Sequence, residues 1–209
     1  MKSIKILAMA LVLTSATATY AQNEADNTTD RSISFGVKGG VNFASISGDD
    51  IESPDSRTSF HVGGLVEFPL ASIFSLQVEA MYSGKGFEYD NVLGDDGDHA
   101  ELQLDYIDVP VLAKIYAFKG FSFEVGPQFS FLINEEFDYE PNSNGGDIEL
   151  DDSEFEADNK FDFGVAGGVS FQTDMGLFAS GRYTYGLTEI YENTDAMNSV
   201  FQISIGYKF

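Results

Sequence analysis

Cysteine is absent from the 209 residues, which excludes a disulfide scaffold, a thiol catalyst and a lipid-modified cysteine. Basic residues are scarce, with 11 Lys and Arg against 34 Asp and Glu. The formal charge of −23 excludes nucleic acid as a partner, because phosphate binding needs clustered bases. Proline is rare, at 5 residues, whereas glycine (21) and aromatic residues (14%) are abundant. This composition disfavours both disorder and a helical bundle, and the length fits one domain.

The N-terminal segment has the pattern of an export signal. Two lysines precede an apolar run from Ile6 to Leu13, and small residues follow as far as Ala21. We expect residues 1–21 to be a signal peptide cleaved after Ala21, with cleavage after Ala18 as the alternative. An anchoring helix is disfavoured, because the run has about half of the ~20 apolar residues that a membrane span needs. Residues 22–31 then form a polar leader.

The remaining chain alternates apolar residues with small or polar ones, which is the period of a β-strand. Leu102, Leu104 and Tyr106 lie on the opposite parity from the residues that follow them, and this shift predicts a bulge near Tyr106. The alternation recurs in eight segments, at 33–43, 60–68, 76–84, 107–115, 121–133, 161–171, 177–187 and 201–209.

Short and long connections alternate between these segments. Short turns are expected at 69–72, 117–120 and 173–176, and long connections at 46–57, 86–101, 134–158 and 189–198. Strands of about ten residues fit a tilted membrane strand, and aromatic residues near strand ends fit interfacial girdles. Residues 32–209 are therefore predicted to form an all-β, eight-stranded antiparallel up-and-down transmembrane β-barrel. Its short turns and both ends should face the periplasm.

Charged residues inside or at the edge of the expected strands all lie on the parity opposite to the apolar one. They are Lys38, Glu67, Glu79, Lys85, Asp108, Lys114, Glu124, Asp162, Arg182 and Lys208. A lipid-facing Lys or Arg at mid-membrane costs ~2–4 kcal/mol, so this parity is expected to face the lumen. Asp105 is ambiguous because it lies at the predicted bulge. A soluble exported β-protein, with its polar face outward, is the alternative fold-level interpretation.

Bulky side chains share the inward parity with the charges. They are Gln77, Met81, Leu112, Gln128, Leu132, Phe178 and Gln202. Eight strands leave an interior that side chains can fill, so we expect a lumen closed to solute flow. Lys114→Ala or Glu79→Ala should lower thermal stability by leaving a partner charge unpaired. Inward glycines are evidence against a filled lumen, since they leave room for a wet gap; they stand at positions 36, 40, 63, 126, 164 and 168.

Two segments resemble motifs of the PorT-like outer-membrane barrel family of Bacteroidetes. Residues 76–86, Leu-Gln-Val-Glu-Ala-Met-Tyr-Ser-Gly-Lys-Gly, are similar to its third-strand motif, with Val78 where the family often has proline. Residues 106–114, Tyr-Ile-Asp-Val-Pro-Val-Leu-Ala-Lys, resemble its fourth-strand pattern. The resemblance covers about Ser32 to Phe209 and implies an eight-stranded barrel exported to the outer membrane. The best-known member is linked to protein secretion, but that role is not transferred to this chain.

Catalytic chemistry finds little support in the sequence. The two histidines are His61, on the inward parity, and His99, in an acidic connection. His61 could be paired with Ser59 or Ser83 as in lipid-modifying barrels, but no spacing supports this, and a hydrogen-bonded luminal histidine is the preferred interpretation. We therefore expect no enzyme activity, no cofactor, and no catalytic, cofactor-binding or metal-binding residues.

The long connections hold 24 acidic residues and one base, Arg57. Residues 95–98 and 147–152 offer oxygen ligands, although neither has the spacing of a calcium-binding loop. A solvated, repulsive loop surface is the simpler interpretation, with weak, salt-sensitive binding of divalent cations. The predicted function is a structural or interaction barrel in outer-membrane lipid, linked to secretion or envelope integrity through envelope or secretion proteins. The alternatives are a narrow porin-like channel and a lipid-active outer-membrane enzyme.

Overall fold

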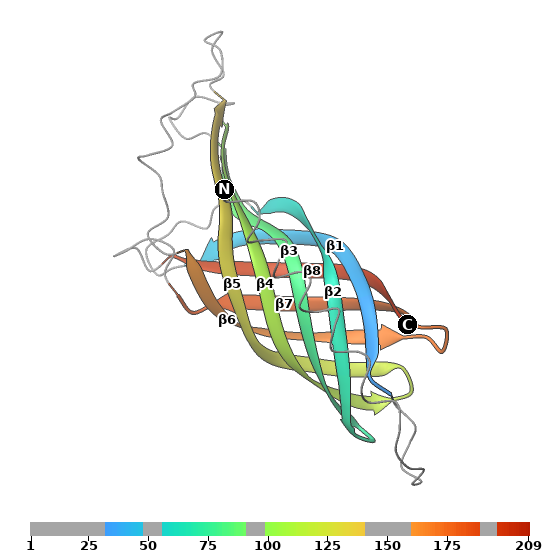
Figure 1. Cartoon of the computed structure of the whole chain (residues 1–209). Helices are drawn as coiled ribbons and strands as arrows, with labels where there is room; N and C mark the ends of the chain where they lie inside the picture. Colours follow the sequence, from blue (N-terminus) through green and yellow to red (C-terminus); the bar gives the residue numbers. More distant parts are fainter. Residues whose placement is uncertain (1–31, 48–55, 91–98, 141–159, 189–195) are drawn as a thin grey trace, which may run out of the picture. The chain divides into compact units, whose positions relative to one another are not determined.

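The computed structural model describes residues 32–47, 56–90, 99–140, 160–188 and 196–209, which form a closed antiparallel β-barrel (Figure 1). Each strand pairs with its neighbours in the sequence, and β1 pairs with β8 to close the barrel. The predicted fold class is confirmed. The strands are β1 (Ser34–Ser47), β2 (Arg57–Ala71), β3 (Phe74–Asp90), β4 (His99–Phe118), β5 (Phe121–Glu140), β6 (Phe161–Gln172), β7 (Leu177–Gly186) and β8 (Met197–Lys208). No helix in these ranges is long and apolar enough to cross a membrane.

The short turns lie at the same end of the barrel as the start of β1 and the end of β8, as predicted. The backbone N–H of Phe209 donates to the carbonyl oxygen of Phe35 at 2.8 Å, next to the start of β1. The N–H of Lys208 donates to Gly176, in the turn between β6 and β7, at 2.9 Å. Gly176 has a φ of 90°, a left-handed conformation that a residue with a Cβ adopts only with strain. The predicted signal peptide and polar leader lie outside the described residues.

Strands β3, β4 and β5 are longer than predicted and continue past the ends of the other strands (Figure 1). Pairing between β3 and β4 runs to Asp90 and His99, and pairing between β4 and β5 runs to His99 and Glu140. Parts of the expected connections 86–101 and 134–158 are therefore strand. The prediction was wrong here because acids such as Glu88, Glu101 and Glu136 are typical of a solvated connection, although Phe87 and Leu102 still follow the period of a strand.

The predicted bulge occurs where expected, but the extra residue is on the partner strand. Asp105 pairs with Asn134 and Tyr106 pairs with Leu132, so Ile133 of β5 has no counterpart on β4. Strand β4 keeps its alternation throughout. The apolar side chains that suggested a shift point to the same side as Asp108, because they pack against one another above the polar lumen.

The side-chain distribution is inverted relative to a soluble protein. Buried side chains are mostly polar or charged, and all ten predicted inward charges are among them, each with at most 6% of its surface exposed. Large apolar side chains such as Val41, Val125 and Ile203 are 41–53% exposed on the outside of the wall. This placement rules out the soluble alternative, in which the polar face would be outermost.

Inward glycines do not leave the gap that they suggested. At each of the six predicted positions, an added Cβ would lie less than 3.0 Å from a carbonyl oxygen of the neighbouring strand. At Gly63, for example, that oxygen belongs to Ala80 on β3. Outward-facing Gly167 differs, because nothing lies within 4 Å of its added Cβ. The inward glycines therefore allow close backbone approach in the tightly curved wall.

Candidate functional site

A network of paired charges crosses the lumen at its middle. Arg182 on β7 donates to both carboxylate oxygens of Glu79 on β3, at 2.7 and 2.9 Å. Because β3 and β7 are four strands apart in a ring of eight, this contact spans the full width of the barrel. Arg182 also donates to Glu124 of β5 at 2.7 Å, and Lys38 of β1 lies 3.1 Å from Glu79. Four strands are thus joined through buried charged side chains.

A second set of charges fills the half of the lumen nearer the short turns. Lys208 of β8 forms an ion pair with Glu67 of β2, and Tyr116 of β4 donates to the same carboxylate. Lys114 lies 3.9 Å from Glu124 and 4.0 Å from Glu67, and it donates to Gln77 at 3.3 Å. The two sets share Glu124 and form one connected network. Buried charges of both signs stay ionised only when they are paired in this way.

The half of the lumen nearer the long connections is polar but less strongly paired. Lys85 lies 3.0 Å from Asp108, donates to Ser130 at 3.0 Å, and stands 4.3 Å above the ring of Tyr106. Asn198 donates to one oxygen of Asp162 at 2.9 Å. The other oxygen of Asp162 is buried without a hydrogen bond. Each of the five predicted inward acids thus contacts a base or an amide.

His61 lies in the lumen as predicted, between two partners that the sequence analysis missed. Its Nδ1 is 2.6 Å from Oδ1 of Asn42, and its Nε2 is 2.8 Å from Oγ of Ser204. The Asn42 amide donates to the carbonyl oxygen of Gly84, so its oxygen faces His61 and accepts from Nδ1. Nε2 then accepts from Ser204. Asn42 lies on the neighbouring strand β1, whereas Ser204 lies on β8, far from His61 in sequence, and reaches it because β1 and β8 close the barrel.

The order serine, histidine, asparagine matches that of a nucleophile, a base and an orienting group. The two serines weighed from the sequence are not part of it, since Ser59 donates to the carbonyl oxygen of Gly84 and Ser83 accepts from Asn42. All three members are buried, with Ser204 only 4% exposed and His61 only 2% exposed. The geometry therefore permits proton transfer within the triad, while the serine hydroxyl that would react is buried.

An apolar layer lies above the polar lumen, on one face of the extended sheet that the outer ends of β3, β4 and β5 form. Ile46 of β1 packs with Leu102, Leu104 and Tyr106 of β4, and Phe87 and Leu132 pack against this cluster. On the other side of the extended sheet, Arg57 of β2 pairs with Glu101 and donates to Gln103 at 2.7 Å. Asp105, which the sequence left ambiguous, accepts from Gln103 and Asn134 on this side.

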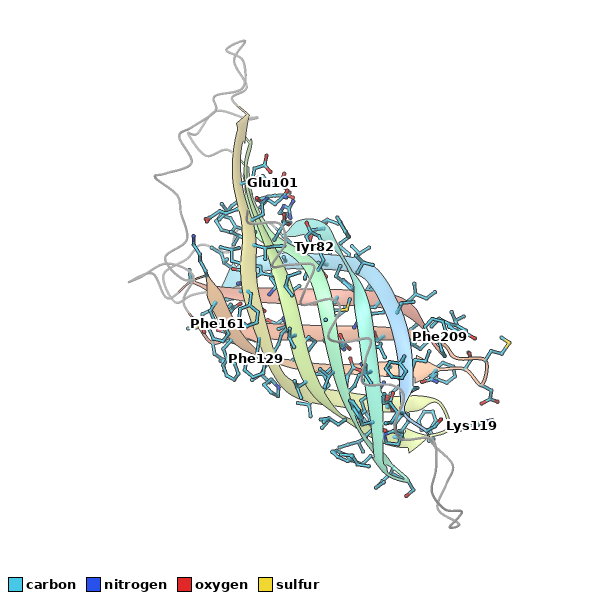
Figure 2. The ribbon with its side chains drawn as sticks, viewed as in Figure 1. Tyr82, Glu101, Lys119, Phe129, Phe161 and Phe209 are labelled. Atoms are coloured by element: carbon cyan, nitrogen blue, oxygen red, sulfur yellow. The ribbon has the colours of Figure 1, made fainter. Side chains whose placement is uncertain are left out.

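The outer wall forms an apolar belt that includes aromatic pairs. Figure 2 shows Phe129 and Phe161 on the outside of the barrel, where Phe129 packs against Phe163 and Phe161 against Phe131 with tilted rings, each at 5.4 Å between ring centres. Phe60 and Tyr82 form a further pair at 5.4 Å. Exposed apolar and aromatic side chains on the outer wall are suited to lipid contact.

The acidic segments that the sequence analysis considered for calcium binding are not among the residues that the structure describes. The acidic segments 95–98 and 147–152 lie outside the described residues, as does the side chain of His99. In the parts of the chain that the structure describes, no group of three or more His, Cys, Asp or Glu side chains is arranged to hold a metal ion.

Comparisons with known proteins give a family and several structural neighbours. A family model described as "Outer membrane protein beta-barrel domain" matches residues 20–192. A comparison with curated protein sequences finds no match. Among solved structures, Ail of Yersinia pestis is 10% identical, with a TM-score of 0.49, and the alignment covers 84% of this chain and 98% of Ail. Neisserial surface protein A is 14% identical, with a TM-score of 0.48 and coverage of 86% and 100%. OprG of Pseudomonas aeruginosa is 14% identical, with a TM-score of 0.43 and coverage of 84% and 95%.

Proposed function

Because the chain belongs to the outer membrane protein β-barrel domain family, we propose that it is a sealed barrel with a structural or interaction role in the outer membrane. The contact between Arg182 and Glu79 carries this proposal, because it joins opposite walls of the lumen through two buried hydrogen bonds. Ions or solutes would have to break this contact to pass. Any binding of partners then takes place on the outer surface and at the two ends of the barrel.

Further parts of the proposal concern relationship and partners. The segments 76–86 and 106–114 support a PorT-like assignment, and the apolar belt supports outer-membrane lipid as the surrounding medium. We propose envelope or secretion proteins as partners, with a role in secretion or envelope integrity. Export through a cleaved signal peptide and weak divalent cation binding at the acidic connections stay predictions, since both involve residues outside the described ranges.

Purified protein in a planar lipid bilayer should show no steady large conductance. Charged and bulky side chains fill the lumen, and eight strands leave no additional width for water. The measurement is single-channel recording at several voltages, with a known porin as the positive control. Stable, reproducible openings from the unmodified protein would reject the sealed barrel and favour the narrow channel.

A lipid-active enzyme is the second candidate, because Ser204, His61 and Asn42 have the hydrogen-bond order of a catalytic triad. We expect a fluorophosphonate probe to leave Ser204 unlabelled in the folded protein, since the hydroxyl is buried. The measurement is mass spectrometry of the intact protein, with Ser204→Ala as the control. Labelling that is lost in Ser204→Ala and in His61→Ala would instead support an enzyme, and lipid analysis after gene deletion would then identify its product.

A further inference from the structure

The extended sheet formed by the outer ends of β3, β4 and β5 has two edges that leave the barrel wall. Pairing between β2 and β3 ends at His61 and Ser83, and pairing between β5 and β6 ends at Phe131 and Phe161. Beyond these points β4 lies in the centre, with β3 and β5 as its neighbours. Figure 1 shows these three strands continuing past the others. An unpaired strand edge is a template for another strand.

Packing on both faces holds this extended sheet in place. One face contributes Leu102 and Leu104 to the apolar cluster with Ile46 of β1. The other face is held by Arg57, which pairs with Glu101 and donates to Gln103 (Glu101 is labelled in Figure 2). An edge that is already ordered loses little conformational entropy when it binds, and this favours strand addition over folding of a loose loop.

The two edges differ in how they are covered. On β3, side chains from β1 and β2 replace the missing strand: Asn42 and Ser59 donate to the carbonyl oxygen of Gly84, and Arg57 donates to that of Lys85. On β5, the N–H of Leu132 donates to Lys160 at 2.9 Å, and no described strand pairs with the outer side of β5 after this point. The β5 edge from Glu136 to Glu140 is therefore the better docking site.

The negative charge of the β5 edge indicates which kind of strand could pair with it. Its sequence, Glu136-Phe137-Asp138-Tyr139-Glu140, has three acids and no base. A second copy of this chain would place like charges opposite one another, which destabilises a strand pair. A segment with alternating bases would instead form opposite-charge pairs. We propose that this edge binds an extended basic segment of a partner protein by adding it as a strand. The proposal rests on the interaction role above and identifies the class of partner.

The phase of the β5 ladder indicates which backbone groups would bind. Leu132 directs its N–H away from β4, and the bulge at Ile133 shifts the alternation by one residue. Beyond the bulge, Phe137 and Tyr139 should direct their backbone groups outward, whereas Glu136 and Asp138 bond to β4. Proline at 137 should therefore block the outer edge while sparing the ladder, because an edge strand tolerates proline where its N–H faces outward.

The test measures peptide binding to the full chain in lipid nanodiscs by fluorescence polarisation. The probe is a short peptide that alternates lysine with threonine or valine. Two matched peptides are compared with it, one with glutamate in place of lysine and one with the same charge but interrupted by prolines. We expect binding of the lysine peptide only. Equal binding of the lysine peptide and the proline-interrupted peptide would show that binding comes from diffuse charge attraction, and this would overturn the proposal. Absence of binding by the lysine peptide would overturn it as well.

Variants of the edge separate backbone from side-chain effects. Phe137→Pro should weaken lysine-peptide binding by about tenfold or more, because it removes main-chain hydrogen bonds. Phe137→Ala, which keeps the backbone N–H, should bind nearly as well as the unmodified chain. Glu136→Lys combined with Asp138→Lys should transfer binding to the glutamate peptide. Heat-dependent gel mobility checks that each variant folds. Self-association of the unmodified chain that Phe137→Pro abolishes would assign the edge to a second copy and overturn the proposal, while leaving the sealed barrel unaffected.

Discussion

Glu79→Ala is expected to lower the free energy of unfolding by ~3–5 kcal/mol, because removing one partner of a buried ion pair leaves the other charge uncompensated. Glu79 is 1% exposed and accepts from Arg182, Lys38 and Gln77. Its loss would strand the Lys38 ammonium and half of the Arg182 contacts in the centre of the lumen. The measurement is equilibrium unfolding in urea after reconstitution into lipid vesicles, monitored by far-UV circular dichroism and by gel mobility.

Asp174→Ala is the matched control, since it also removes the carboxylate of an ion pair. Asp174 lies 2.7 Å from Lys119, but both side chains are at least 75% exposed, and such pairs contribute ~0–1 kcal/mol. Lys114→Ala should be intermediate, because its carboxylate partners lie 3.9 and 4.0 Å away. Equal midpoints for Glu79→Ala and Asp174→Ala would show that the luminal network does not stabilise the barrel.

The strands, and the side of each strand that carries the charged residues, were predictable from sequence because charge in contact with lipid is strongly unfavourable. This penalty places each Lys, Arg, Asp and Glu of a membrane strand on one parity, and alternation alone then assigns side chains such as Lys38 and Arg182 to the lumen. The pairs themselves were not predictable. Whether Arg182 meets Glu79 or another acid depends on strand register and on closure between β1 and β8, which no local pattern encodes.

Features outside the membrane were predicted less well. The outer ends of β3, β4 and β5 are rich in acids, such as Glu88 and Glu136, so the sequence there favoured connections over strands. Leu102 and Leu104 suggested a shift in β4, because apolar side chains were expected only on the outer face, whereas these two form a layer above the polar lumen. Glycine was misleading for a related reason: sequence shows that a side chain is absent, but only the structure shows whether a neighbouring backbone occupies that space, as at Gly63.

Ile203→Arg should destabilise the barrel in lipid by ~2–4 kcal/mol, because it places a charge on the membrane-facing side near the middle of β8. Ile203 is 53% exposed on the outer wall, between Val41 of β1 and Gly181 of β7. The expected loss of stability depends on the medium that surrounds residue 203. In water an exposed substitution of this kind changes stability by only about ±0.5 kcal/mol, whereas in a bilayer the guanidinium must be desolvated or must reach the interface.

The comparison variant for Ile203→Arg is Met175→Arg, in the turn between β6 and β7. Met175 is 76% exposed and lies at the barrel end, where the cost of a charge falls to ~0–1 kcal/mol. Unfolding in lipid vesicles should therefore separate the two variants by at least about 1 kcal/mol, and Ile203→Arg should also reduce the fraction of protein recovered in the outer membrane. Identical stability of the two variants would mean that the apolar belt does not contact lipid at Ile203, and the position of the barrel in the membrane would have to be reassigned.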